Sequence, residues 1–306
     1  MSTIPLKIGR VQAPLPEGAL DRVLAAHLPG ARLLQAQRLS GGVSADVYRL
    51  DIETGGSAPE SVVLRIHGDH HNGHPAALEF DILRAAAGLG LCAPRALALD
   101  ESRLHLPHPY LLLEHISGET VAPTNPDDPR IVRMAETLAR VHAAPAAGLP
   151  ALPVRDDPFP ELFGFLPQDA EFGALRTRLA GMAAARSDGP ATLLHGDFWP
   201  GNLLWQDERI VGILDWEDSA LGDPLSDVAC AALELRYVAG REGAESFLRA
   251  YDRLRPIKPR RLALWQIYVA AAGQHSMGAW GLEPAREAHM RATALSVIRE
   301  ASALVT

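Results

Sequence analysis

The chain contains HGDFWPGNLLW at residues 195–205, then RIVGILDWEDS at 209–219 and LGDPLSDVA at 221–229. Asp197 precedes Asn202 by five residues, and Asp215 follows a short apolar run that is typical of a strand. Apolar runs on both sides of the first loop predict strands that fix its ends. Pro200 and Gly201 predict the turn that brings Asn202 back toward Asp197. The sequence therefore predicts three polar side chains on rigidly held backbone.

The spacing His195-x-Asp197-x-x-x-x-Asn202 has the form of the catalytic loop of protein kinases, with Gly196 in the place of an arginine. Phosphoryl transfer requires oxygens that gain charge to be positioned and neutralised. Mg²⁺ takes oxygen ligands, so Asn202 and Asp215 would supply two of them. Asp197 would accept the proton of a substrate hydroxyl, or orient that hydroxyl. The pattern predicts a phosphotransferase site.

A simple loop is the alternative interpretation, because Gly, Asp and Asn are common turn residues. The chain contains a second His-Gly-Asp at residues 67–69, with no Asn five residues after its Asp. We interpret that copy as a loop. For the copy at residues 195–197, the joint pattern with Asn202 and Asp215 favours a site.

The segments HGDFWPGN (195–202), ILDWEDSALGDP (213–224) and DVA (227–229) resemble the signature blocks of the aminoglycoside phosphotransferase and choline kinase-like family. The resemblance extends from about Leu33 to the end of the chain. It implies an α+β, two-lobed protein-kinase-like fold. Residues 1–116 would form an N-lobe, a small antiparallel sheet with one main helix that covers the nucleotide. Residues 117–306 would form a larger, mainly helical C-lobe with the catalytic loop, the metal site and the acceptor-binding helices.

The composition is that of a globular chain, with 306 residues, 47% hydrophobic and 22% charged residues. A net charge of −8 argues against nucleic acid as the main partner. No apolar run approaches the roughly 20 residues that span a bilayer, so no membrane partner is expected. The first residues lack a signal-peptide pattern, and Cys92 and Cys230 form no pair motif. We expect a cytoplasmic protein, and the sequence leaves its oligomeric state open.

A glycine-containing turn lies between two predicted strands, 33–39 and 46–52. In the kinase-like interpretation, backbone N–H groups of this turn face the phosphates of ATP or GTP. An ordinary hairpin turn is the alternative. The residues of the turn expected to bind nucleotide are Ser40, Gly41, Gly42 and Ser44.

Arg65 ends the predicted strand 61–66, at the point where protein kinases place a phosphate-binding lysine. We expect it to pair with Glu79 on the predicted helix 75–87. Arginine presents a wide fork and lysine a point charge, so the phosphate contact would differ in geometry. A solvent-exposed strand end is the alternative.

Four histidines crowd the segment after that strand: His67, His70, His71 and His74. We interpret them as solvated loop residues. The two remaining strands of the sheet are predicted at 94–99 and 110–116. The resemblance makes the end of the second one the linker between lobes, where backbone groups near Glu114 and Ile116 would bind adenine.

The predicted C-lobe begins with a helix at 127–143 and a proline-rich connection at 145–160. Further helices are expected at 161–186 (one or two), 225–237, 243–253, 259–279 and 284–303.

Four residues near the catalytic loop are expected to support it. His195 would hold the loop through hydrogen bonds to the backbone. Glu217 would bind a second Mg²⁺ through water or contact the substrate. Asp223 and Asp227 would cap the helix that begins near Pro224 and stabilise the loop.

The acceptor would be a small molecule with a hydroxyl group. The negative potential of Asp197, Asp215, Glu217 and Asp218 would favour a neutral or cationic acceptor. A catalytically degenerate, nucleotide-binding regulatory module is the alternative function, and Arg65 is the feature in its favour. A protein kinase is disfavoured, because no activation segment is recognisable after Asp215.

Overall fold

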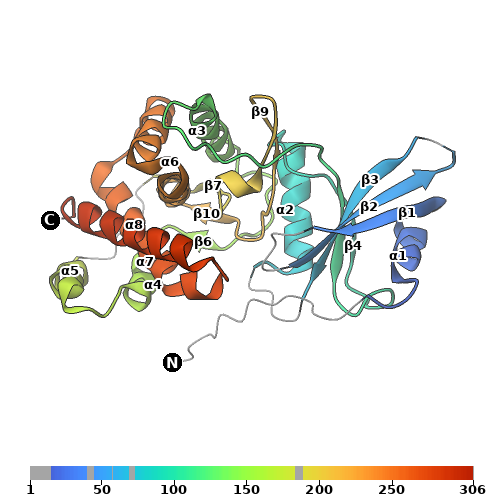
Figure 1. Ribbon diagram of the computed structural model, residues 1–306, viewed down its shortest axis with the longest axis horizontal. Coiled ribbons are helices and arrows are strands. Elements are labelled where there is room, and N and C mark those ends of the chain that lie inside the picture. The colour runs from blue at the N-terminus through green and yellow to red at the C-terminus, as the bar shows by residue number, and fades with distance from the viewer. Residues whose placement is uncertain (1–14, 40–44, 57, 69–72, 183–188, 306) are drawn as a thin grey trace. The chain divides into compact units, whose positions relative to one another are not determined.

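The computed structural model describes residues 15–39, 45–56, 58–68, 73–182 and 189–305. The chain divides into two compact units, Met1–Ser117 and Gly118–Thr306. Figure 1 shows a sheet of long strands in the first unit and mostly helices in the second. The predicted α+β class is therefore confirmed.

The first unit contains a five-stranded antiparallel sheet with the strand order β1-β2-β3-β5-β4. Its strands are β1 (Ala31–Arg38), β2 (Ala45–Thr54), β3 (Glu60–His67), β4 (Ala96–Asp100) and β5 (Tyr110–Glu114). In β2 and β3, apolar residues alternate toward one face, and Leu50, Ile52 and Leu64 are almost completely buried. Burial of this face stabilises the sheet and fixes the register of its strands.

Two helices belong to the same unit. Helix α1 (Ala19–His27) contacts β1, and helix α2 (Ala76–Gly88) contacts β4, at opposite edges of the sheet. Val23 and Leu24 of α1 join the buried cluster around Leu50. Helix α2 instead buries Ile82 and Leu83.

The second unit is mainly helical. Its α-helices are α3 (Pro129–His142), α4 (Phe159–Phe165), α5 (Gly173–Ala180), α6 (Leu225–Leu254), α7 (Pro259–Ser276) and α8 (Pro284–Ser302). Helix α3 begins with Asp128, whose side chain accepts the backbone N–H of Arg130, and with Pro129 in the first turn. Leucine, isoleucine and alanine side chains of α7 and α8 pack against α4 and α5 in one buried cluster.

Gly240 interrupts α6 with a backbone φ of 72° and ψ of −173°. Glycine adopts this conformation without the steric penalty of a side chain. The sequence predicts two separate helices here, 225–237 and 243–253. The structure agrees with this prediction, because α6 consists of two helical segments that meet at the non-helical Gly240.

Short strands hold the loops of the second unit. They form a three-stranded sheet of β6 (Val154–Arg155), β10 (Ala220–Gly222) and β7 (Thr192–Leu194), and a hairpin of β8 (Leu203–Gln206) and β9 (Arg209–Ile213). Strand β6 lies inside the segment 145–160 that the sequence predicts only as a connection. It pairs with β10 in parallel, where a Cβ on Gly222 would lie 1.9 Å from the carbonyl oxygen of Arg155. The close approach of these two strands therefore requires glycine at position 222.

Within the described residues, no helix combines the length and the apolar character that crossing a bilayer requires.

Candidate active site

The loop after β7 carries the first group of predicted site residues. A single 3₁₀ turn, Pro200–Asn202, connects this loop to β8, and the N–H of Asn202 donates to the carbonyl of Trp199 at 3.0 Å. The indole of Trp199 covers Gly201 so closely that a Cβ there would lie 2.2 Å from the ring. The Pro-Gly pair thus supplies both the turn and the space for Trp199.

Asn202 binds Asp197 twice. Its side-chain nitrogen donates to the backbone oxygen of Asp197 at 2.9 Å and to the carboxylate at 3.0 Å. This orientation directs the side-chain oxygen of Asn202 away from Asp197, and no residue that the structure describes hydrogen-bonds that oxygen. An amide oxygen of this kind is a suitable ligand for a hard cation.

The carboxyl of Asp197 is a weakened acid. Burial raises its pKa to about 7, and the negative charges of Asp215 and Asp218 act in the same direction. Hydrogen bonds from the side chains of Asn202 and Trp199 oppose this shift. A carboxyl with a pKa near neutrality is suited to accept a proton from a hydroxyl group.

Asp215 lies between β9 and β10 with a backbone φ of 64°, a conformation that aspartate tolerates better than most residues. Trp216, which is completely buried, closes the turn by donating its indole N–H to the carbonyl of Ile213 at 2.9 Å. Ser219 donates to the carbonyl of Trp216 at 2.7 Å. Neighbouring Glu217 is also buried. The backbone around Asp215 is thus fixed from both sides.

His195 connects the two loops. It is fully buried, its Nε2 donates to the carbonyl of Leu214 at 2.9 Å, and its Nδ1 accepts the N–H of Asp197 at 3.3 Å. Burial lowers the pKa of its imidazole, which keeps the ring neutral in this arrangement. The ring therefore holds the backbone of Asp197 next to that of Asp215.

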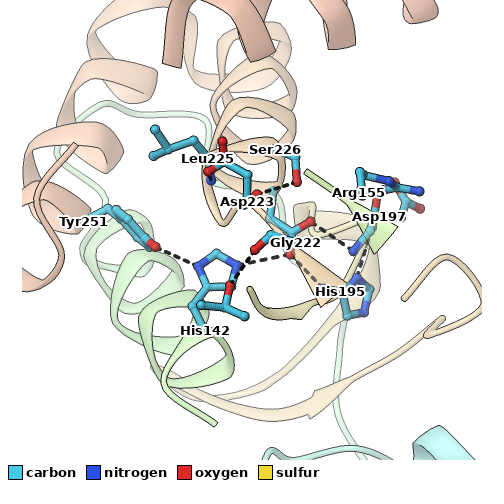
Figure 2. Close-up of polar contacts among 12 residues, drawn as sticks. His142, Arg155, His195, Asp197, Gly222, Asp223, Leu225, Ser226 and Tyr251 are labelled. Carbon is cyan, nitrogen blue, oxygen red and sulfur yellow. Dashed lines mark hydrogen bonds and ion pairs between the residues drawn. The ribbon is translucent and has the colours of Figure 1, made fainter. Parts of the chain in front are cut away.

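Asp227 fixes the start of the catalytic loop. Its carboxylate accepts the backbone N–H of His195 at 2.7 Å and that of Gly196 at 3.0 Å. His142 of α3 contacts the same carboxylate at 3.2 Å and Tyr251 at 2.7 Å (Figure 2). Burial alone would raise the pKa of Asp227, but its contacts with His142 and His195 lower it.

Asp223 connects the loop after β10 to α7. One of its carboxylate oxygens accepts the N–H of Leu225 at 3.0 Å, which stabilises the start of α6. The other oxygen accepts the indole N–H of Trp265 at 2.7 Å and a hydrogen bond from Arg261. Asp227, in contrast, binds the catalytic loop rather than the N–H groups of its own helix, so the prediction that it caps the helix is wrong.

Gly196 occupies the place of the kinase arginine with a backbone φ of 90°. A Cβ at this position would lie 2.1 Å from the carbonyl oxygen of Asp218. Glycine is required here both by the conformation and by the packing of the two loops.

In the first unit, the buried side chains of Arg65 and Glu79 form an ion pair with an Nε–Oε1 distance of 3.0 Å. His67 shares Glu79, with its Nε2 at 3.0 Å from Oε2. The interpretation of His67 and His74 as solvated loop residues is wrong, because only 4% and 9% of their surfaces are exposed. His67 is the last residue of β3 and its ring points into the unit, which sequence spacing did not reveal.

The structure describes only two of the other residues predicted to bind nucleotide, Glu114 and Ile116. The carboxylate of Glu114 accepts a hydrogen bond from the Nε of Arg95 at 3.0 Å. Ile116 is partly buried. Ser40, Gly41, Gly42 and Ser44 lie outside the described residues.

Within the described part of the chain, no three His, Cys, Asp or Glu side chains form a cluster that could hold a metal ion by themselves. The donor set of Asn202 and Asp215 fits Mg²⁺, which takes one or two protein oxygens and completes its shell with phosphates and water. These residues do not fit a zinc site, because they offer neither thiolate nor imidazole.

The model of the phosphotransferase enzyme family matches residues 35–265. This match covers most of the sheet of the first unit and the loops that carry Asp197 and Asp215. The chain belongs to the phosphotransferase enzyme family. The resemblance seen in its sequence is therefore confirmed.

Relatives with known names support this assignment. The chain is 30% identical over 178 residues to viomycin phosphotransferase of Streptomyces vinaceus, covering 49% of this chain and 59% of the relative. It is 29% identical over 189 residues to acyl-CoA dehydrogenase family member 10 of Mus musculus, covering 52% of this chain and 17% of that protein. The chain thus spans less than two thirds of the length of either relative.

A solved structure shows the same fold. A thermostable variant of aminoglycoside phosphotransferase APH(4)-Ia, in a ternary complex with AMP-PNP and hygromycin B, matches with a TM-score of 0.63 and 16% identity. The match covers 92% of this chain and 98% of that structure. The kinase-like fold predicted for this chain is confirmed.

Proposed function

We propose that this phosphotransferase transfers the γ-phosphoryl group of ATP or GTP to a hydroxyl group of a small molecule, with Mg²⁺ as cofactor. The observation that carries the proposal is the double hydrogen bond between Asn202 and Asp197, which leaves the amide oxygen of Asn202 available to a cation. The bound AMP-PNP and hygromycin B of the similar APH(4)-Ia structure agree with a nucleotide donor and a hydroxyl-bearing acceptor.

Asp197 is the residue proposed to act on the acceptor. Its raised pKa suits a carboxylate that takes the hydroxyl proton as the oxygen attacks the γ-phosphorus. The bond between that phosphorus and the β,γ-bridging oxygen breaks, and the nucleoside diphosphate leaves. The loop contacts of His195 and Asp227 hold Asp197 for this step, and Asp223 supports the neighbouring loop.

Asn202 and Asp215 would hold Mg²⁺, which supplies charge neutralisation on the phosphate oxygens. Glu217 is proposed to support this site, since it is buried two residues after Asp215. The rigid turn that Trp216 closes would keep the carboxylate of Asp215 in place.

The first unit is proposed to bind the nucleotide. Glu79 orients the guanidinium of Arg65, as the Glu of a kinase orients its phosphate-binding Lys. The turn of Ser40, Gly41, Gly42 and Ser44 would cover the phosphates. Backbone groups near Glu114 and Ile116 would contact the base.

A thermal-shift titration with ATP and GTP, each with and without Mg²⁺, tests this function. We expect a Mg²⁺-dependent rise in Tm for the wild type, because a ligand that binds only the folded state stabilises it. Asp215→Asn should abolish the Mg²⁺ dependence. Asp207→Asn, on the exposed turn between β8 and β9, is the matched control. No shift with either nucleotide would contradict the proposal.

A further inference from the structure

Strand β3 carries two basic side chains on one face of the sheet. Residues two apart on a strand point to the same side, and the residues between them point to the other side. Leu64 and Ile66 belong to the buried cluster that α1 joins, so Arg65 and His67 both face the opposite side. Arg65 and His67 expose only 7% and 4% of their surfaces. Two basic groups are therefore buried close together along one strand.

Glu79 is the acid that meets both of them. It lies in the first turn of α2, where its N–H donates to the carbonyl of Pro75 at 3.1 Å, and it is 2% exposed. The Nε of Arg65 lies 3.0 Å from Oε1 and 3.2 Å from Oε2 of this acid. The Nε2 of His67 lies 3.0 Å from Oε2. Each carboxylate oxygen therefore has a basic group beside it, and Oε2 has two.

The contact with Glu79 alone fixes the guanidinium of Arg65 only in part. Both carboxylate oxygens meet the same nitrogen, Nε, so the carboxylate can turn about this contact and keep one oxygen in place. An arginine binds phosphate through a planar fork whose orientation matters, whereas a lysine binds as a point charge. Arginine in the place of the kinase lysine therefore requires a carboxylate whose own orientation is fixed.

The ring of His67 supplies this constraint from rigid backbone. The N–H of His67 donates to the carbonyl of Pro109 at 2.9 Å, and β3 is paired on both sides, with β2 and β5. A carboxylate oxygen 3.0 Å from Nε2 favours the forms of the imidazole that carry a proton on this nitrogen. Oε2 of Glu79 is thus attracted to a second group that does not move with Arg65.

Simple packing is a less favourable role for His67. A buried imidazole costs more free energy than an apolar side chain unless its polar edge meets a partner. On the other face of the same strand, where packing alone is required, the chain has Leu64 and Ile66. The contact with Glu79 therefore explains the histidine better than its volume does.

We propose that His67 is a positioning residue for the phosphates of the nucleotide. Its ring fixes the carboxylate of Glu79, and this carboxylate fixes the plane of the Arg65 guanidinium in the orientation that phosphate oxygens require. The inference rests on the proposed function, because it assigns a supporting residue to the phosphate site proposed for the first unit.

Isothermal titration calorimetry with Mg²⁺–ATP and Mg²⁺–GTP tests this role. His67→Leu removes the ring N–H and keeps a buried side chain. We expect it to raise the Kd of the nucleotide that the wild type binds by about tenfold, the lower end for a hydrogen bond to a charged group. His67→Gln can bring an amide N–H near the place of Nε2, so it should restore most of the affinity.

His27→Leu is the matched control. His27 lies in the same unit and also contacts a buried acid, since its Nε2 is 3.4 Å from Oδ2 of Asp100. Its replacement should lower Tm but leave the nucleotide Kd unchanged, which separates a general weakening of the unit from a loss of positioning. If His67→Leu does not fold, His67→Asn repeats the test, because its amide is one methylene shorter than that of Gln and does not reach Glu79.

Three results would overturn the inference. The first is a wild-type Kd for His67→Leu, or for His67→Asn in its place. The second is a loss of affinity in His67→Gln as large as in that variant, and the third is an equal loss in His27→Leu. A wild type that binds neither Mg²⁺–ATP nor Mg²⁺–GTP would instead contradict the proposed function, on which the inference rests.

Discussion

The carboxylate of Asp227 accepts the backbone N–H of His195 at 2.7 Å, although 32 residues separate them. The same carboxylate accepts the N–H of Gly196, so one buried acid holds two consecutive peptide groups of the catalytic loop. These two hydrogen bonds therefore connect the start of α6 directly to the loop that carries Asp197.

Asp227→Asn should weaken the connection between α6 and this loop. An amide offers one acceptor oxygen, and its NH₂ group would face a backbone N–H as a second donor. We expect a loss of about 1–3 kcal/mol in the free energy of unfolding, from urea denaturation, and a lower kcat. Glu242→Gln, an exposed change on the same helix, should alter neither. An unchanged unfolding midpoint in Asp227→Asn would show that the two hydrogen bonds do not stabilise the loop.

Asp197→Asn should lower kcat by about 10²- to 10⁴-fold, because the amide cannot accept the hydroxyl proton. The Mg²⁺-dependent rise in Tm with nucleotide should remain, since the proposed metal ligands, Asn202 and Asp215, are other residues. Steady-state kinetics and thermal shift on the same preparation check both expectations. Activity near that of the wild type would show that Asp197 is not the base.

Gly196→Ala should displace the catalytic loop from Asp218. Gly148 offers a matched comparison, because it also has a φ of 90°. A Cβ at Gly148 would have no atom within 4 Å, whereas a Cβ at Gly196 would lie 2.1 Å from an oxygen. Both alanine variants carry the same backbone penalty. We therefore expect Gly196→Ala to lower the free energy of unfolding by about 1–3 kcal/mol more than Gly148→Ala does. Equal losses in urea denaturation would show that the loop relaxes freely.

Asp100 should make the stability of the protein depend on acid pH. Burial opposes its ionisation, but hydrogen bonds from Ser102, Tyr110 and His27 outweigh burial and lower its pKa from 3.8 to about 2. A lowered pKa contributes stability above pH 3.8 that is lost as the pH falls toward 2.

Urea unfolding between pH 5 and pH 2 tests this expectation. The wild type should lose more stability over this range than Asp100→Asn. Asp21→Asn, an exposed change in α1, should follow the wild type. If the free energy of unfolding fell equally for the wild type and Asp100→Asn, the lowered pKa of Asp100 would be contradicted.

Glu234 should have the opposite effect on stability. Its folded-state pKa of about 8 lies above the ordinary 4.5, so the folded state holds a proton that the unfolded state releases. Stability should therefore fall between pH 4.5 and pH 8. Glu234→Gln should remove this fall and have a higher Tm than the wild type at pH 8, measured without acceptor. A lower Tm for Glu234→Gln at pH 8 would show that the free carboxylate is stabilised by contacts.

The strands of the first unit could be predicted from sequence because β2 alternates apolar and polar residues and β3 carries a short apolar run rich in valine. The two-residue strand β6 could not, since its pairing with β10 joins residues 67 positions apart, Arg155 and Gly222. A local sequence pattern cannot indicate a pairing between residues so far apart. His67 was misinterpreted for a related reason, because its partner Glu79 comes from the following helix.

The proximity of Asp197 and Asn202 follows from local spacing, so the sequence could indicate it. The supporting contacts of His142, Tyr251 and Trp265 could not be indicated, because each reaches the loops from a distant helix.

The close contact between Gly196 and Asp218 also bears on regulation. Protein kinases can be switched on when arginines bind a phosphate group on an activation loop and order it. Position 196 has no side chain to bind such a phosphate and no room for one. Asp227 and His195 hold the loop by contacts that need no covalent modification. A phosphate group on a neighbouring loop would therefore find no arginine at position 196 to bind.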